Sequence, residues 1–292
     1  MRPSTVGVDP LPARAALAAA LRDASYEVLP LRGAEERILA DVPRSVPLTV
    51  TTTESRGLET TVELAARLSE AGYRAAPHLA ARQVRDGDHL REVVALIRSA
   101  GVDEVFVIGG DAPTPAGPFP DALSLLEELH RTGTSFGSVG IGGYPEGHGR
   151  ITDVQIRRAL AAKAPYATHL VTQLCFSAAT TVRWAQRLRV DGVALPVRVG
   201  VPGPIARTKL IRIASGLGLG QSARFLAKQQ NLIGRFLLPG GYRPDRLVRR
   251  LAPALAGPDG PLAGLHVYTF NEVGATEAWR QDRLARLVGA DR

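Results

Sequence analysis

Residues 89–111 read HLREVVALIRSAGVDEVFVIGGD, and the architecture of the chain can be worked out from this stretch. Apolar residues recur at helical spacing over residues 89–100, and Gly101 is a residue type that commonly ends helices. The run Glu104–Ile108 is rich in β-branched and aromatic residues, which is typical of a strand. A Gly-Gly-Asp loop follows at once. The stretch therefore predicts a helix, a tight stop, a strand and a loop, in that order.

The same order repeats on both sides of this stretch. Short strand-like runs alternate with amphipathic helical patterns, which predicts parallel strands joined by helical crossovers. Eight such units within 292 residues predict an α/β fold, a closed (βα)8 TIM barrel with extra helices. An open doubly wound sheet is the alternative. The expected strands are Tyr26–Leu29, Pro47–Thr51, Ala75–His78, Glu104–Ile108, Ser135–Gly140, His169–Cys175, Val197–Gly200 and Leu265–Tyr268.

The whole chain, residues 1–292, is expected to form one barrel domain. A helical pattern at about residues 12–24 precedes the first strand. The segment at about residues 205–256 is mostly helical by pattern and is too long for one crossover. We therefore expect a helical insert between the seventh and the eighth strand.

Composition excludes several classes of protein. Hydrophobic residues make up 45% of the chain and charged residues 22%, which argues against disorder. Cys175 is the only cysteine, so it cannot form an intrachain disulfide; it is expected in the core of a cytoplasmic protein. The net charge is +8, but the basic residues are interleaved with 28 acidic ones, so we expect anionic small molecules rather than nucleic acid as partners. The apolar run Ala15–Leu21 is too short to cross a membrane.

The active site of a barrel lies at the carboxyl ends of its strands. Glu27 stands among apolar neighbours, where burial would raise its pKa and make it a general acid near neutral pH; a strand residue that faces solvent is the alternative. Asp111 follows two glycines that let a ligand approach the backbone, or it caps a Pro/Gly-rich turn. The histidines lack the spacing of a helical metal site, so no metal is expected. The polar residues at these strand ends are Glu27, Thr49, His78, Asp111, Tyr144, His148 and Gln173.

The order and spacing of these residues resemble those of the methylenetetrahydrofolate reductase family, in its bacterial catalytic-domain form. The match runs from about Tyr26 to Asn271. It is carried by Ser-Tyr-Glu27-Val-Leu-Pro, Val-Pro-Leu-Thr49, Ala-Ala-Pro-His78-Leu, Gly110-Asp111, Gly-Tyr144-Pro-Glu-Gly-His148, Lys163, Thr172-Gln173 and Tyr268-Thr-Phe-Asn271.

The resemblance implies a flavoprotein that binds FAD and uses NADH or NADPH as co-substrate. Such an enzyme reduces 5,10-methylenetetrahydrofolate to 5-methyltetrahydrofolate in one-carbon metabolism, a step that serves methionine biosynthesis. The resemblance also implies that Glu27 is the general acid that helps to open the imidazolidine ring. It further implies that Asp111 is the carboxylate that favours the resulting cation. FAD contacts are implied for Thr49, His78, Gly110, Asp111, Tyr144, His148 and Lys163, and folate contacts for Glu27 and Gln173.

The chain departs from the family pattern at some positions. The family usually has an arginine before Gly-Asp, where this chain has Gly109. A glutamine and a phenylalanine of the folate loop align with Lys209 and Ile213. One alternative is therefore a divergent barrel homologue with weak or no flavin, which binds folate or another one-carbon carrier as a partner protein. A flavin-independent reductase that takes hydride directly from a nicotinamide is the other. A homo-oligomer is left open.

Overall fold

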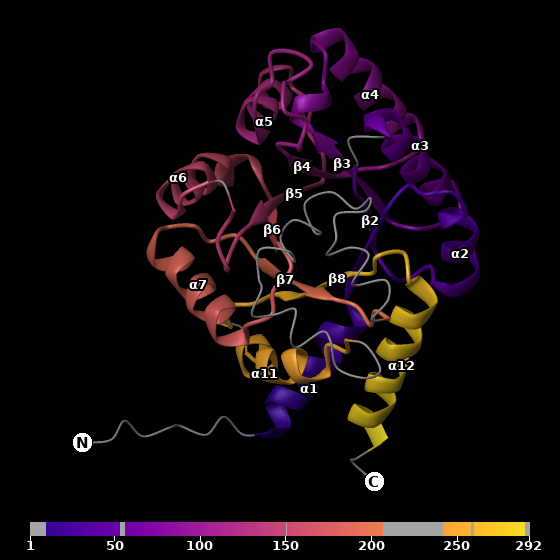
Figure 1. Cartoon of the computed structure of the whole chain (residues 1–292), viewed down its shortest axis with the longest axis vertical. Coiled ribbons are helices and arrows are strands. Elements are labelled where there is room, and N and C mark those ends of the chain that lie inside the picture. Colours follow the sequence, from indigo (N-terminus) through magenta and orange to yellow (C-terminus); the bar gives the residue numbers. More distant parts are fainter. Residues whose placement is uncertain (1–9, 53–55, 150, 207–241, 258–259, 290–292) are drawn as a thin grey trace.

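The structure is a computed structural model that describes residues 10–52, 56–149, 151–206, 242–257 and 260–289. Eight strands close into a barrel in sequence order, and each pairs with its neighbours in parallel. The predicted (βα)8 barrel is confirmed, and the open sheet is wrong (Figure 1). The strands are β1 (Ser25–Val28), β2 (Leu48–Val50), β3 (Ala75–Ala80), β4 (Glu104–Ile108), β5 (Ser138–Gly143), β6 (His169–Thr172), β7 (Val197–Pro202) and β8 (Gly264–Tyr268).

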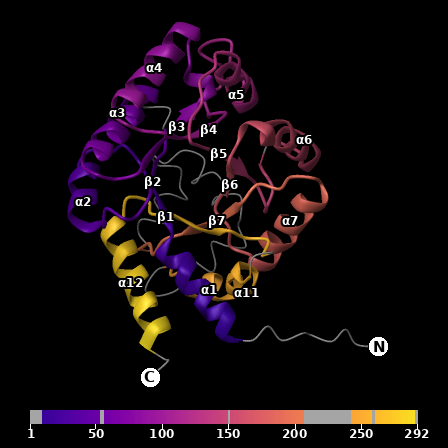
Figure 2. The same cartoon turned by 180° about the vertical axis from the view of Figure 1, so that it is seen from behind.

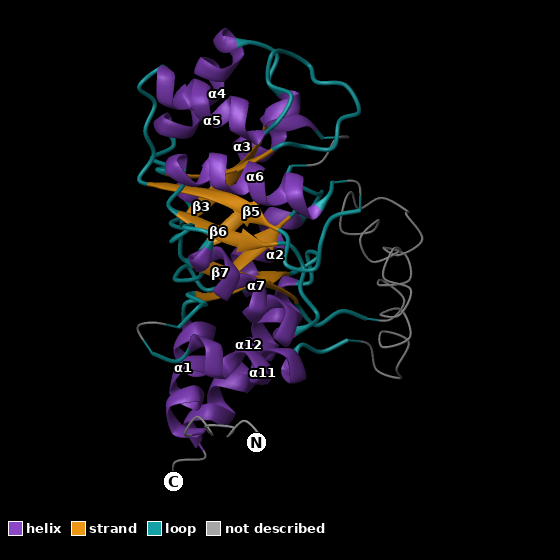
Figure 3. Ribbon diagram, turned by 90° about the vertical axis from the view of Figure 1, so that its left-hand side faces the viewer, coloured by secondary structure: helices purple, strands orange, loops and turns teal. Residues whose placement is uncertain are grey.

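Helices surround the strands, as Figure 1 shows down the barrel and Figure 3 shows from the side. This arrangement buries apolar outer faces of the strands, with α3 (Gly57–Glu70) on β2 and β3, α5 (Ala122–Arg131) on β4 and α1 (Pro10–Arg22) on β8. In the described part of the chain, no helix is long and apolar enough to cross a lipid bilayer. The helices that follow the strands are α2 (Ala34–Asp41), α3 (Gly57–Glu70), α4 (Gly87–Ser99), α5 (Ala122–Arg131), α6 (Asp153–Lys163), α7 (Ala178–Val190), α11 (Asp245–Leu255) and α12 (Val273–Gly289).

The N-terminal helix α1 (Pro10–Arg22) packs beside α11 and α12 in this outer layer (Figure 2). Its Arg14 donates from Nε to the carbonyl of Leu287 on α12 at 2.9 Å. The predicted helical insert lies mostly outside the described residues, as do Lys209 and Ile213. Of that insert, the structure describes α11, whose apolar face is buried.

The fifth strand begins three residues later than the sequence pattern predicts. Glycines weaken a strand pattern, so the predicted strand was placed over the more polar residues that precede β5. The barrel nevertheless requires the glycines of β5. A Cβ atom at Gly140 would lie 2.3 Å from the ring of Phe106, and one at Gly143 would lie 2.5 Å from the ring of Trp184. Neighbouring aromatic rings therefore occupy the space that side chains of β5 would fill.

The inside of the barrel is unusually polar. Tyr26 points outward, because its hydroxyl donates to Glu277 on α12, so its neighbours Ser25 and Glu27 point inward. Barrels of this kind usually fill the interior with bulky branched residues. The buried polar side chains that the strands direct into the barrel are Ser25, Thr49, His78 and His266. A polar interior costs free energy of folding, which points to a function there.

A buried ion pair joins α12 to the barrel and to α1. Arg280 donates to both carboxylate oxygens of Glu277, at 2.9 and 2.8 Å, while Tyr26 donates to the same carboxylate at 2.7 Å. Arg280 also donates to the carbonyl of Leu21 on α1 at 3.3 Å. Burial alone would raise the pKa of Glu277, but these hydrogen bonds hold the pKa below its ordinary value.

We expect Glu277→Ala to lower the free energy of unfolding by about 3–5 kcal/mol at neutral pH, because it leaves Arg280 buried without its partner. The pKa of Glu277 is lowered by folding, so its stabilisation is present above the ordinary pKa and is lost as pH falls through the folded value. Urea denaturation at pH 7 and at about pH 3 measures both effects. Glu63→Ala, on the exposed face of α3, is the control. A loss below about 1 kcal/mol at pH 7 would contradict the prediction.

Candidate active site at the carboxyl end of the barrel

Glu27 lies between two imidazole rings inside the barrel. Its Oε2 is 3.8 Å from Nε2 of His78 on β3 and 3.9 Å from Nε2 of His266 on β8. The three side chains are 13%, 6% and 2% exposed, respectively. The barrel register pairs Glu27 with Thr49 on one side and with Tyr268 on the other. The carboxyl group is therefore enclosed by strands from both ends of the chain.

Burial sets the charge of these groups. Burial raises the pKa of Glu27 to about 7, with His78 acting in the opposite direction. Burial also lowers the pKa of His78 to about 4 and that of His266 to about 3. Near neutral pH both rings are therefore neutral, and Glu27 exists in both protonation states. The contacts are between a carboxyl group and neutral imidazoles rather than between opposite charges.

His266 is the residue of this group that sequence reasoning missed. Its Nδ1 lies 2.8 Å from the hydroxyl of Ser25, a hydrogen bond that fixes the ring. The sequence could have pointed to His266, because it stands two residues before Tyr268 in the predicted eighth strand. Side chains two residues apart lie on the same face of a strand. The sequence alone does not bring that strand next to Glu27, because the pairing of β8 with β1 depends on barrel closure.

The turn after β8 holds the backbone around Glu27. The hydroxyl of Thr269 donates to the carbonyl of Glu27 at 2.7 Å. The side chain of Asn271 accepts from the N–H of Leu29 at 2.8 Å and donates to its carbonyl at 2.9 Å. Phe270 and Asn271 have positive φ angles of 52° and 59°, a left-handed conformation that non-glycine residues adopt uncommonly. This turn fixes the seam between β8 and β1.

Two buried polar atoms beside Glu27 have no hydrogen-bond partner in the described structure. They are Oγ1 of Thr49 and Nδ1 of His78. The ring of His78 also stacks on Phe106, with centroids 4.6 Å apart. Buried polar atoms are nearly always satisfied in native proteins, so unpaired ones suit a ligand with polar edges. Donor and acceptor atoms at the edge of a heteroaromatic ring would satisfy both.

Tyr144 and the Asp111 loop lie at the same end of the barrel. The rings of Tyr144 and His148 meet edge to face with centroids 5.2 Å apart. Burial raises the pKa of Tyr144, and the Asp111 carboxylate raises it further. Burial likewise raises the pKa of Tyr268, with smaller contributions from Glu27 and Tyr144. The structure therefore brings these predicted residues together, while their roles remain predictions.

Gly110 follows β4, Lys163 ends α6 and Gln173 follows β6. Gly110 has φ +87°, and a Cβ there would lie 3.2 Å from the Cβ of Ala80, so the Asp111 loop passes close to the end of β3. Lys163 ends α6 and is half-buried; burial lowers its pKa, and Asp121 opposes that effect. The side-chain oxygen of Gln173 accepts from the N–H of the next residue at 3.0 Å.

Two other residues near this end have structural roles. The Glu146 carboxylate accepts from the N–H groups of Phe176 and Ser177, at 2.7 and 2.8 Å, and so holds the segment that leads into α7, while Ser177 itself caps the helix. Cys175 is fully buried, as expected, and burial raises the pKa of its thiol to about 12.

Within the described ranges, no group of three or more His, Cys, Asp or Glu side chains could hold a metal ion.

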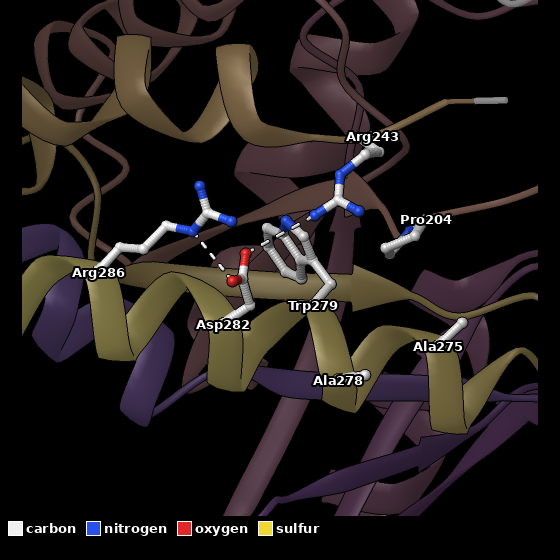
Figure 4. Close-up of a pocket in the computed structure, with 7 residues that line it drawn as sticks. All are labelled: Pro204, Arg243, Ala275, Ala278, Trp279, Asp282 and Arg286. Carbon is white, nitrogen blue, oxygen red and sulfur yellow. Dashed lines mark hydrogen bonds and ion pairs between the residues drawn. The ribbon is translucent and has the colours of Figure 1, made fainter. Parts of the chain in front are cut away.

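A groove of about 320 Å³ lies along the outer face of α12 (Figure 4). Asp282 accepts from Nε of Arg286 at 3.0 Å and pairs with Arg243 at 3.9 Å. Pro204 and Ala275 follow β7 and β8, but none of the lining residues is one of the site residues that the sequence predicts. Its lining residues are Pro204, Arg243, Ala275, Ala278, Trp279, Asp282 and Arg286.

Comparison with known proteins gives one family match. The model of the family described as methylenetetrahydrofolate reductase matches residues 28–218. Among solved structures, a putative phosphonomutase from Burkholderia cenocepacia J2315 is 14% identical, with a TM-score of 0.47, over 97% of this chain and 100% of that chain. A putative lyase/mutase from the same organism is 18% identical, with a TM-score of 0.45, over 97% of this chain and 88% of that chain.

The buried carboxyl group makes stability depend on pH. Folding raises the pKa of Glu27 from 4.5 to about 7. Stability therefore falls as pH rises from about 4.5, and the loss is complete above about pH 7. We expect Glu27→Gln to be more stable than the parent by about 1–3 kcal/mol at pH 8, with the gain shrinking toward pH 4.5. Urea denaturation across this pH range measures the difference in free energy of unfolding between the variant and the parent, with Glu63→Gln as the control. A difference that does not depend on pH would contradict the prediction.

Proposed function

The chain belongs to the methylenetetrahydrofolate reductase family, and from this premise we propose that it reduces 5,10-methylenetetrahydrofolate to 5-methyltetrahydrofolate, with NADH or NADPH as the hydride source and FAD as the carrier. Membership makes it an oxidoreductase with a role in folate one-carbon reduction. The observation that carries the finer proposal is the buried carboxyl group of Glu27, with a pKa of about 7. We propose cytoplasmic one-carbon metabolism, leading to methionine, as its setting.

Glu27 is proposed as the general acid. Reduction of the substrate requires that its five-membered ring open to an iminium cation, and protonation of the leaving amine nitrogen assists that step. A carboxyl group with a pKa near the working pH holds a proton and can still release it, which suits general acid catalysis. The neutral rings of His78 and His266, 3.8 and 3.9 Å away, do not force Glu27 into its ionised form.

Asp111 is proposed as the carboxylate that favours the cation. A fixed negative charge near a developing positive charge stabilises it most where water is excluded. The effect of Asp111 on the pKa of Tyr144 supports a position beside the barrel mouth. We propose that the side-chain amide of Gln173 binds the polar edge of the folate.

The residues at this end fit FAD in its ring portion. When bound, FAD would accept hydride from the nicotinamide and pass it to the folate. We propose that the unpaired Oγ1 of Thr49 and Nδ1 of His78 bind the ring edge and that Tyr144 lies against a ring face. His148 and Lys163 are proposed to bind the phosphates, and Gly110 to let the cofactor approach the loop backbone.

One observation favours the second candidate, a reductase with weak or no flavin that takes hydride directly from the nicotinamide. Gly109 supplies no cation, and the guanidinium of the nearby Arg82 donates to three backbone carbonyls of the chain itself. The absorption spectrum of the purified protein separates the two candidates, because bound flavin absorbs visible light and a flavin-free enzyme does not.

We expect Glu27→Gln to lower the rate of methylenetetrahydrofolate reduction by about 10²–10⁴-fold, because glutamine cannot donate the proton. In a flavin-loaded enzyme, electron transfer from NAD(P)H to flavin should change little. The parent should also lose folate activity as pH rises above about 7, since Glu27 ionises there. Steady-state and half-reaction kinetics measure these effects. A variant that turns over at nearly the parent rate would remove Glu27 from the mechanism.

We expect Gly109→Arg to raise FAD retention. A Cβ at Gly109 would meet only backbone atoms of Ala122 and Asp121, at 3.9 and 4.0 Å, so a Cβ atom fits there without strain. A charge-assisted hydrogen bond to a phosphate contributes roughly 1.5–3 kcal/mol, about tenfold to over a hundredfold in affinity. Flavin titration measures the affinity for FAD, and gel filtration measures its retention. Gly109→Met is the control, because it adds a long side chain without a charge. Equal retention in the two variants would show that no anionic cofactor reaches this position.

A further inference from the structure

The loop that carries Asp111 is fastened by one side chain from another strand. Arg82 follows β3 in a short 3-10 helix, Ala81–Gln83. Its guanidinium donates to three backbone carbonyls of the loop after β4: from Nε to Ala112 at 2.6 Å, from Nη2 to Pro113 at 2.7 Å and from Nη1 to Pro120 at 3.0 Å. The side chain thus binds both ends of the segment from Ala112 to Pro120.

Backbone contacts fasten the same loop to the same segment. The N–H of Arg82 donates to the carbonyl of Gly109 at 3.0 Å, and the N–H of Ala116 donates to the carbonyl of Arg82 at 2.9 Å. A Cβ at Gly117 would lie 1.8 Å from the carbonyl oxygen of Arg85, so at this point the two backbones are in direct contact. The loop therefore rests on the residues that follow β3 along most of its length.

The sequence of the loop explains why it needs an outside donor. Residues 112–120 read APTPAGPFP and contain four prolines, which have no N–H to donate. Such a segment has more carbonyl acceptors than backbone donors, so it cannot satisfy its own carbonyls. Arginine brings five N–H donors in a planar fork. Arg82 uses both sides of that fork on the loop, through charged hydrogen bonds, which are stronger than neutral ones.

Asp111 lies between the carbonyls that Arg82 holds. The backbone of Arg82 binds Gly109 two residues before it, and the side chain binds Ala112 directly after it. We propose that Arg82 is a positioning residue for the reaction: it holds the backbone on both sides of Asp111, so that the carboxylate faces the barrel mouth beside Tyr144. This role rests on the proposed function of Asp111, through which Arg82 acts.

A double-mutant cycle tests the role by kinetics. Arg82→Met keeps the length of the side chain and removes its donors, and Asp111→Asn removes the charge. Both single variants should lower kcat for methylenetetrahydrofolate reduction by about 10–10²-fold, within the range for a lost electrostatic contact. In the Arg82→Met background, Asp111→Asn should cost less than about threefold, because coupled residues are not additive. Losses that multiply would overturn the proposal and leave Arg82 with a role in stability alone.

The matched control is Arg85→Met. Arg85 lies three residues away, is exposed and pairs with Glu59 at 3.2 Å, and it makes no side-chain bond to the loop among the described contacts. It should leave kcat within about twofold of the parent, as expected for a surface change. If Arg82→Met fails to fold, Arg82→Lys takes its place in the cycle with the same two outcomes, since lysine lacks the planar fork.

A second measurement does not depend on turnover. The Asp111 carboxylate raises the pKa of Tyr144, so displacing the loop should lower it. ¹⁹F NMR titration of protein labelled with 3-fluorotyrosine, with the signal assigned by Tyr144→Phe, measures this pKa. Arg82→Met and Asp111→Asn should each lower it, the double variant no further than either, and Arg85→Met should leave it unchanged. An unchanged Tyr144 pKa in folded Arg82→Met overturns the role of Arg82, whereas a parent enzyme without folate turnover overturns the proposed function.

Discussion

The exclusion of water from the Glu27 carboxyl group is the constraint on which the rest of the structure depends. Ionising this group inside the barrel is costly, and burial raises its pKa to about 7. The surrounding residues hold the carboxyl group in this buried position without supplying an opposite charge. Ser25 fixes the ring of His266, and the turn at Thr269 fixes the backbone of Glu27. The polar interior is therefore arranged to hold a proton, at the expense of stability above neutral pH.

The alternation of strands and helices made the fold predictable, because parallel strands with helical crossovers leave few topologies. The strand Glu104–Ile108 was placed correctly, since its β-branched and aromatic residues face the core. The strand that ends at Gly143 was placed too early, because its glycines are dictated by neighbours such as Trp184 rather than by strand propensity. The pattern likewise gave no separate prediction for α12, whose buried face meets α1 and α2.

Much of the candidate site could be predicted from the positions of residues at strand ends. The contacts between strands could not be predicted. Glu27 and His78 were singled out by their places in separate strands, whereas His266 enters only when β8 pairs with β1. Glu146 stands beside Tyr144 in the sequence, and in the structure its carboxylate accepts from the N–H groups of Phe176 and Ser177, just before α7. A sequence shows which residue types stand at the ends of strands, but packing between distant segments decides which of them have a structural role.

The charges around the barrel mouth favour a cationic reaction centre over an anionic ligand. Glu27 and Asp111 contribute carboxyl groups, and the imidazoles of His78 and His266 are neutral near pH 7. The nearby cation, Arg82, is committed to carbonyls of its own chain. Oriented carboxylates and carbonyls that exclude water stabilise developing positive charge, whereas a pyrophosphate in the same place would need donors. Among the described residues, the groups around Glu27 and Asp111 are therefore better suited to stabilise positive charge than to bind a phosphate.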